Sequence, residues 1–234
     1  MTGVVGHRGA MAVCAENTLA SFRRGELDGA AAIELDVHLS ADARLVVIHD
    51  ATVDRTAVGG RRHGVVGELT WAELQEVELG DEQRIPSLEA ALGVTRAEVH
   101  VEIKDPAAAL QVAELVLREE LQDRVTLTSF DLGALAELRR RSTRLRLGVI
   151  TTEPTAAALA AMADLDAGLL AAGAAHLDRE VTGRLQAGGA QVCGWPVRTE
   201  AELGRALAVG VDLVTADDPG WCRARLEALA EATV

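Results

Sequence analysis

The stretch AIELDV, from Ala32 to Val37, has the apolar composition of a buried strand in a parallel sheet. Its acidic residues, Glu34 and Asp36, share one face because side chains alternate along a strand. The stretch VHVEI, from Val99 to Ile103, repeats the pattern with Glu102. Inward carboxylates on apolar strands cost free energy unless a cation neutralises them. We therefore expect parallel strands that gather acidic side chains around a positive ion.

Similar apolar runs alternate with Ala- and Leu-rich stretches of helical period, which is typical of parallel strands joined by crossover helices. The expected strands are Val4–Gly6, Ala32–Val37, Val99–Ile103, Val125–Thr128, Leu145–Ile150, Gly168–Ala171, Gln191–Trp195 and Val211–Thr215. The length of 234 residues is close to the roughly 250 of a single α/β barrel. We predict an α/β fold, a single (β/α)8 TIM-type barrel that forms one domain over residues 1–234.

One segment interrupts the alternation of strands and helices. The residues between Val37 and Leu45 are too few for a crossover helix, so Leu45–Ile48 should return antiparallel as a short β-hairpin insertion after strand 2. A two-residue turn at Asp42–Ala43 would place His49 directly opposite Asp36. The hairpin alone would then bring this imidazole to the acidic pair.

The composition excludes several kinds of partner and location. The net charge of −13 and the pI near 4.9 disfavour binding to nucleic acid or to an anionic membrane surface. No apolar stretch approaches the roughly 18 residues of a membrane span, and the N-terminus MTGVVGHRGA lacks the features of a signal peptide. Cys14, Cys193 and Cys222 lack metal-ligand spacing and are expected to be free thiols. We predict a cytoplasmic protein.

Further charged residues stand where predicted strands end, which is the edge of a barrel where catalytic residues collect. His7-Arg8-Gly9 follows the first strand, His49-Asp50 follows the hairpin, and Lys104 follows Glu102. Carboxylates, imidazoles and fixed cations can together support metal-assisted attack on a phosphate ester. We expect His7 and His49 to move protons, Glu34, Asp36 and Glu102 to bind Mg²⁺ or Ca²⁺, and Arg8 and Lys104 to bind the phosphate.

Some of these residues also have simpler interpretations. Glu102 and Lys104 share a face and could form a plain buried ion pair. Trp195, at the end of a strand, either packs in the core or lines a substrate pocket at the barrel mouth. Asp50 either shapes a turn or orients a neighbour by hydrogen bonding. The remaining histidines are expected to be structural or exposed, namely His38, His63, His100 and His176.

These residues resemble the motifs of the glycerophosphodiester phosphodiesterases. The matching stretches are Gly6–Ala10, Glu16–Phe22, Ile33–Val37, Leu45–Asp50, Asp54–Thr56, Leu69–Leu74, Ile85–Leu88, Val101–Lys104, Thr128–Asp131, Trp195–Val197 and Gly210–Asp212. The resemblance implies a TIM-type barrel and metal-dependent hydrolysis of a small glycerophosphodiester, such as glycerophosphocholine or glycerophosphoethanolamine, to sn-glycerol 3-phosphate and an alcohol. It assigns the acid and the base to His7 and His49, the metal ligands to Glu34, Asp36 and Glu102, and the phosphate contacts to Arg8 and Lys104.

The chain departs from the family pattern near the expected alcohol pocket. Ala15 stands where a Pro is usual, and the later motifs read Trp195-Pro-Val-Arg198 and Ala216-Asp-Asp-Pro219. These departures leave the reacting groups in place and affect the shape and polarity of the pocket.

Three other activities remain open from the sequence. A lysophospholipase D or sphingomyelinase D-like phosphodiesterase would need an apolar ledge, for which the chain offers Trp195 and Trp71. A metal-dependent aldolase or isomerase would have no use for Arg8 and Lys104 beside two histidines. A non-catalytic barrel that binds a phosphorylated ligand would have little use for two titrating groups. The sequence carries no signal for an oligomeric state.

Overall fold

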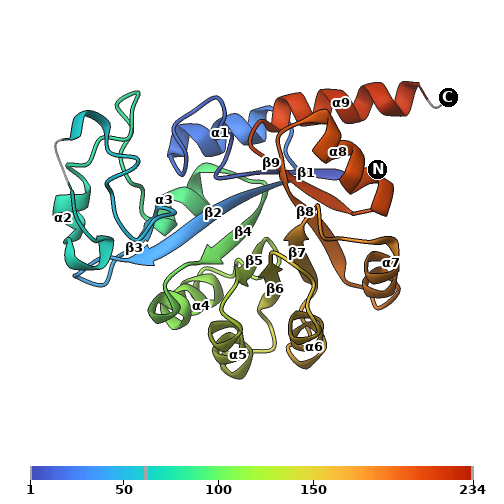
Figure 1. Ribbon diagram of the computed structural model, residues 1–234. Coiled ribbons are helices and arrows are strands. Elements are labelled where there is room, and N and C mark those ends of the chain that lie inside the picture. The colour runs from blue at the N-terminus through green and yellow to red at the C-terminus, as the bar shows by residue number, and fades with distance from the viewer. Residues whose placement is uncertain (1, 61–62, 233–234) are drawn as a thin grey trace.

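Eight parallel strands pair side by side and close into a barrel in the computed structural model, which describes residues 2–60 and 63–232 (Figure 1). These strands are β1 (Gly3–Gly6), β2 (Ala32–Leu39), β4 (Glu98–Ile103), β5 (Val125–Ser129), β6 (Arg146–Thr151), β7 (Leu169–Gly173), β8 (Gln191–Val197) and β9 (Leu213–Ala216). They follow the order β1-β9-β8-β7-β6-β5-β4-β2, and pairing of β1 with β2 closes the ring. The predicted barrel is confirmed.

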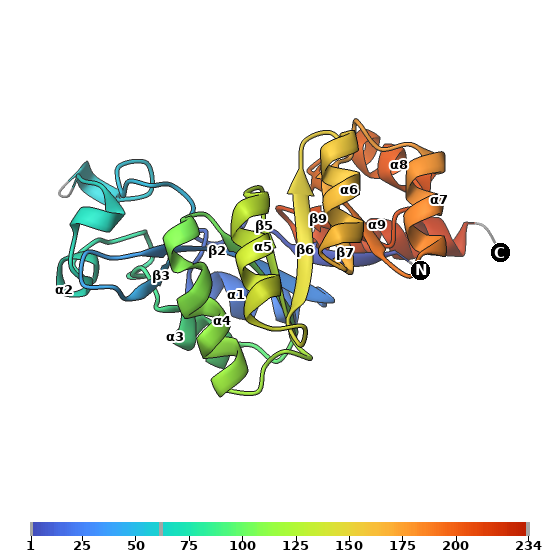
Figure 2. The same ribbon diagram turned by 90° about the horizontal axis from the view of Figure 1, so that it is seen from below.

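Helices surround the strands (Figures 1 and 2). They are α1 (Leu19–Leu27), α3 (Leu88–Val94), α4 (Ala109–Arg118), α5 (Leu132–Arg141), α6 (Ala156–Asp164), α7 (Arg179–Ala187), α8 (Glu200–Val209) and α9 (Pro219–Glu231), with single 3₁₀ turns η1 (Val58–Gly60), η2 (Val66–Glu68) and η3 (Pro106–Ala108). Capping side chains fix where they begin, because they accept hydrogen bonds from free N–H groups of the first turn. The Thr199 hydroxyl accepts from the backbone of Glu202, whose carboxylate accepts in return from the backbone of Thr199.

The predicted hairpin after strand 2 is present, but its predicted register is wrong. Strand β3 (Leu45–Val47) runs antiparallel to β2 outside the barrel, with Val37 opposite Val47. This register is one residue away from the one that would pair His49 with Asp36, and the Ile48 N–H instead donates to the Asp36 carbonyl at 3.0 Å. The two-residue turn is therefore replaced by a longer one.

Local hydrogen bonds explain the longer turn. The Ser40 hydroxyl donates to the Asp42 carboxylate at 2.6 Å and accepts from the Arg44 N–H at 2.8 Å. Ala43 adopts a left-handed φ of 59°, which is a feature of three-residue hairpin loops. His49 consequently lies beyond the strand, and it reaches the barrel mouth only because the chain bends after β3.

The segment after β3, which includes α2 (Trp71–Leu74), projects to one side of the barrel (Figure 1). Together with β3 it forms a separate buried cluster of Val46, Ile48, Val53, Val66, Leu74, Val77, Leu79 and Ile85. This small core anchors the loop that carries His49 and Asp50. Another apolar cluster, which includes Val5, Leu169, Cys193 and Leu213, fills part of the barrel interior, and the polar site residues lie nearer the carboxyl ends of the strands.

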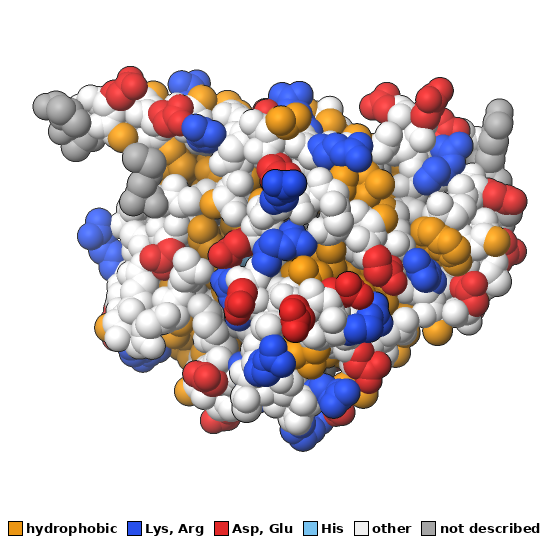
Figure 3. All heavy atoms as spheres, turned by 180° about the vertical axis from the view of Figure 1, so that it is seen from behind, with side chains coloured by type: hydrophobic (Ala, Val, Ile, Leu, Met, Phe, Trp, Pro, Cys, Tyr) orange, Lys and Arg blue, Asp and Glu red, His pale blue; other side chains and the backbone are white. Residues whose placement is uncertain are grey.

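Acidic and basic side chains are interspersed over the face shown in Figure 3, so the excess negative charge forms no single patch there. Among the described residues, no helix combines the length and the apolar character that crossing a bilayer requires. Cys14, Cys193 and Cys222 are free, as predicted.

Candidate active site

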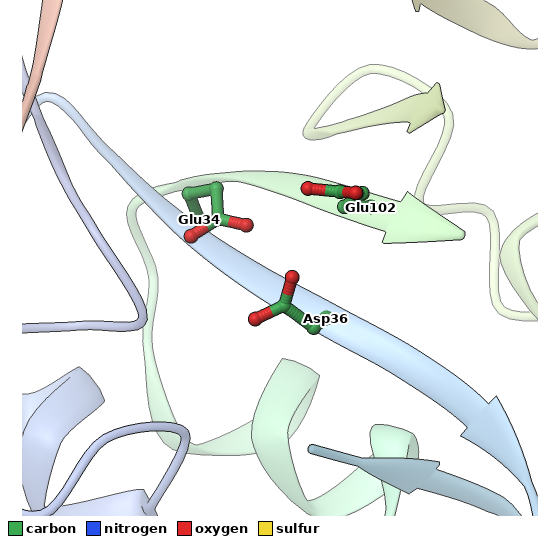
Figure 4. Close-up of side chains that lie close together, drawn as sticks. All are labelled: Glu34, Asp36 and Glu102. Carbon is green, nitrogen blue, oxygen red and sulfur yellow. The ribbon is translucent and has the colours of Figure 1, made fainter. Parts of the chain in front are cut away.

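Three buried carboxylates meet inside the barrel mouth. Glu34 and Asp36 project from β2, and Glu102 projects from the neighbouring strand β4, where it is the register partner of Asp36. Their side chains are 9%, 1% and 7% exposed, and one oxygen from each lies within 4.8 Å of the others. Figure 4 shows the three carboxylates turned toward a common space. The structure thus brings together all three predicted ligands, in a cluster that can hold a metal ion.

Two cations compensate these three carboxylates only in part. Lys104 Nζ lies 2.6 Å from Glu102 and 3.3 Å from Asp36, and Arg8 Nε lies 3.4 Å from Asp36. Burial raises the pKa of Glu34 well above its ordinary value, and the charges of Asp36 and Glu102 raise it further. Burial and the charge of Asp36 likewise raise the pKa of Glu102. One negative charge is therefore left over when all three are ionised, which favours binding of a divalent cation.

Hydrogen bonds fix the carboxylates in place. The Arg8 backbone N–H donates to Glu34 Oε2 at 2.9 Å, and Asn17 Nδ2 donates to Asp36 Oδ2 at 2.8 Å. Asp36 Oδ1 makes no hydrogen bond among the described residues and faces the Lys104 ammonium group at 3.3 Å. Sequence reasoning missed Asn17, although it stands in the Glu16-Asn17-Thr18 motif just before helix α1.

His7 and a carboxylate from the last strand form a hydrogen-bonded pair. His7 Nδ1 lies 2.6 Å from Asp217 Oδ1, and Asp217 directly follows β9. A carboxylate on Nδ1 fixes the ring orientation and leaves Nε2 for a ligand. Asp217 was not predicted as a site residue, although its position after a strand that should end at this edge was a usable signal.

His49 forms the matching pair on the other side of the site. Its Nδ1 lies 2.6 Å from Asp50 Oδ1, and Arg55 Nε donates to Asp50 Oδ2 at 2.6 Å. Burial lowers the pKa of His49, and the positive charges of Lys104 and Arg8 lower it further, although Asp36 and Asp50 oppose this shift. A neutral imidazole at pH 7 can accept a proton. Asp50 therefore orients a neighbour rather than only shaping a turn.

A charged chain links the His49 pair to the predicted phosphate contact. Arg55 donates two hydrogen bonds to Glu16, at 2.8 and 2.7 Å, and Arg8 Nη1 donates to the same carboxylate at 2.8 Å. Burial alone would raise the pKa of Glu16, but the two guanidinium groups lower it below its ordinary value. The next residue after Arg8 must be a glycine, because Gly9 has a φ of 88° and a Cβ atom there would lie 2.4–2.6 Å from atoms of Ser21. Glu16 and Arg55 lie in stretches of sequence that match the family, but sequence reasoning assigned no role to either residue.

The site opens into a cavity of about 370 Å³. Its lining includes His7, Arg8, Met11, Glu34, His49, His100, Glu102, Lys104, Thr128, Phe130, Ile150, Ala171, Trp195, Pro196, Arg198, Thr215 and Asp217. Trp195 is in the lining, and its ring meets Phe130 edge to face with centroids 5.8 Å apart. Sequence reasoning missed Phe130, which follows strand β5 in the Thr128–Asp131 motif.

The other histidines lie in different surroundings. His38 Nε2 is 3.1 Å from the His49 carbonyl, so it supports the loop after β3. His63 and His176 are exposed beside Asp54 and Glu153, respectively. His100 is buried, as a structural residue would be, but it also lines the cavity.

Residues 7–221 match the Glycerophosphoryl diester phosphodiesterase family. A glycerophosphodiester phosphodiesterase from Caldanaerobacter subterraneus is 30% identical, over 93% of this chain and 95% of that protein. One from Bacillus altitudinis is 28% identical, over 94% and 96%.

Solved structures of this kind share the fold. The glycerophosphodiester phosphodiesterase of Thermotoga maritima superposes with a TM-score of 0.81 at 26% identity, and the match covers 94% of this chain and 96% of that one. An Oleispira antarctica phosphodiesterase, solved in complex with the product sn-glycerol-3-phosphate, superposes with a TM-score of 0.86 at 23% identity over 97% of both chains.

Proposed function

Because the chain belongs to the Glycerophosphoryl diester phosphodiesterase family and is an enzyme of that class, we propose that it hydrolyses glycerophosphodiesters such as glycerophosphocholine and glycerophosphoethanolamine. The products are sn-glycerol 3-phosphate and the free alcohol. One observation carries the proposal: two imidazoles, each hydrogen-bonded at Nδ1 to an aspartate, line the same cavity as the acidic cluster. The whole chain serves this reaction as one barrel domain.

The two histidines act as the acid and the base. With Nδ1 held by Asp217 in one case and Asp50 in the other, each ring presents Nε2 to the substrate. One imidazole removes a proton from the attacking oxygen, which belongs either to water or to a hydroxyl of the substrate. Attack by the hydroxyl gives a cyclic phosphate, which water then opens to sn-glycerol 3-phosphate. The other imidazole donates a proton to the alcohol oxygen as its bond to phosphorus breaks, so the leaving group departs neutral.

Charged side chains bind the phosphate. Burial alone would lower the pKa of Lys104, but the negative charges of Asp36 and Glu102 raise it. The amine of Lys104 therefore stays protonated beside the cavity. Arg8 lines the same wall and is held by Glu16. Both cations offset charge that develops on the phosphate oxygens during attack.

A divalent cation completes this arrangement in the proposal. Glu34, Asp36 and Glu102 would hold it, and their all-oxygen donor set suits Mg²⁺ or Ca²⁺. When bound, the ion supplies Lewis-acid polarisation of a phosphate oxygen.

We also propose that the protein resides in the cytoplasm, because its free thiols agree with a reducing compartment.

The test is a substrate panel with metal add-back, together with single histidine variants. We expect activity to vanish with a chelator and return with Mg²⁺ or Ca²⁺, and His7→Ala and His49→Ala each to lower kcat/KM on the order of 10²-fold or more. The exposed His63→Ala serves as the matched control and should keep full activity. Near-full turnover in either active-site variant would remove that histidine from the mechanism. Choline release from lysophosphatidylcholine rather than from glycerophosphocholine would favour the lysophospholipase D alternative.

A further inference from the structure

Two buried polar side chains in the cavity lack partners in the protein. Thr128 is 2% exposed, and its Oγ1 has no hydrogen-bond partner among the described residues. His100 is 6% exposed, and no described residue makes a hydrogen bond to its imidazole. Buried polar groups in folded proteins are almost always hydrogen-bonded, so an unpartnered pair that faces a cavity points to a ligand.

The strand register places this pair directly beside the acidic cluster of Figure 4. Thr128 on β5 is the register partner of Glu102 on β4, and His100 on β4 is the partner of Glu34 on β2. Neighbouring strands lie about 4.8 Å apart. A group bound by Thr128 and His100 is therefore close enough to belong to the same small molecule as a phosphate bound by Arg8 and Lys104.

The chemistry of the pair selects a neutral hydroxyl group. A neutral imidazole such as that of His100 offers one hydrogen-bond donor and one acceptor. The Thr128 hydroxyl also donates and accepts. A charged ligand group is better bound elsewhere in the same cavity, a cation by the carboxylates Glu34 and Glu102 and an anion by Lys104 and Arg8. A hydroxyl, which both donates and accepts, fits both side chains.

We propose that Thr128 and His100 form a subsite for a hydroxyl group of the substrate's glycerol moiety. The inference rests on the proposed function, in which the glycerol side stays attached to the phosphate. In glycerophosphocholine and glycerophosphoethanolamine the free hydroxyls belong to glycerol, since the head-group oxygen is esterified. The glycerol end then lies deep in the barrel beside Glu102, and the variable alcohol points toward the mouth.

The subsite can be tested by binding, without turnover. We would titrate the metal-loaded protein with sn-glycerol 3-phosphate and with propyl phosphate, which keeps the phosphate and carbon chain but lacks both hydroxyls. The wild type should prefer sn-glycerol 3-phosphate about 10-fold, since one or two neutral hydrogen bonds distinguish the ligands. Thr128→Val and His100→Leu should each reduce this preference several-fold, by weakening sn-glycerol 3-phosphate binding alone. His100→Gln, which keeps a donor and an acceptor, should retain much of it.

Thr182→Val is the matched control. Thr182 on helix α7 is 1% exposed, its Oγ1 likewise has no hydrogen-bond partner among the described residues, and it lies outside the lining of this cavity. Its variant should leave the preference unchanged. Equal binding of the two phosphates by the wild type, or a preference that survives both Thr128→Val and His100→Leu, overturns the subsite. If the preference behaves as expected but no glycerophosphodiester is hydrolysed, the proposed function fails and the subsite stands.

Discussion

The acidic cluster predicts an unusual pair of effects for Glu34→Gln. The substitution keeps an oxygen that can accept the hydrogen bond from the Arg8 backbone, now at 2.9 Å from Glu34 Oε2. It removes one of three carboxylates that face two cations, so the leftover negative charge disappears. We therefore expect the metal-free variant to be more stable than the metal-free wild type and to gain less stability from a divalent cation.

The size of both effects follows from burial and from ligand linkage. Relief of an uncompensated buried charge should contribute about 1 kcal/mol or more at pH 7. A cation at about 100 times its Kd stabilises a protein that binds it only when folded by about 2.7 kcal/mol. For a chain of this size, about 2–4 °C of Tm corresponds to each kcal/mol. The wild type should thus gain roughly 5–10 °C from Mg²⁺ or Ca²⁺, and the variant should gain much less.

The effect of the cation should also depend on pH. The pKa values of Glu34 and Glu102 are raised in the folded, metal-free protein. Their protonated forms therefore contribute stability that is fully present below the ordinary pKa of 4.5 and is lost as pH rises through the raised values. A cation favours the ionised carboxylates, so its stabilising effect should be larger at pH 8 than at pH 5.

Thermal unfolding measures all of these quantities. Scans of wild type and Glu34→Gln, with chelator and with added cation at pH 5 and pH 8, give the four Tm differences. Glu114→Gln, on the exposed face of helix α4, makes the same chemical change outside the site and should behave as wild type. A metal-free Glu34→Gln that is less stable than wild type, or an equal cation effect in both proteins, would refute the reasoning.

Two further substitutions test the groups that position the histidines. Asp217→Asn removes the carboxylate that lies 2.6 Å from His7 Nδ1. We expect kcat to fall on the order of 10²-fold with little change in KM. A change in KM alone would instead assign Asp217 to substrate binding. Arg55→Ala breaks the bridge that Arg55 forms between Glu16 and Asp50. We expect kcat/KM to fall about 10-fold, with partial recovery in Arg55→Lys. Wild-type kinetics in Arg55→Ala would make the bridge purely structural.

Local sequence was sufficient to predict most of the fold. Alternation of apolar runs with helical periods located the barrel strands because a buried parallel strand and an amphipathic helix have different hydrophobic periods. Capping boxes at Thr70 and Thr199 stabilise the first turns of α2 and α8, and each needs only a cap and a partner three residues apart. The hairpin register failed because hydrogen bonds of Ser40 stabilise a longer turn than the shortest one.

The sequence by itself also determined which side chains meet in the site, because the carboxyl ends of parallel strands in a barrel share one edge. That rule predicted that Glu34, Asp36 and Glu102 would meet. The partner of His49 is its sequence neighbour Asp50, whereas only the tertiary structure decided the partner of His7. His7 and Asp217 stand 210 positions apart and meet because β1 pairs with β9 when the barrel closes. Such a contact depends on closure of the whole sheet, and no local pattern of residues encodes it.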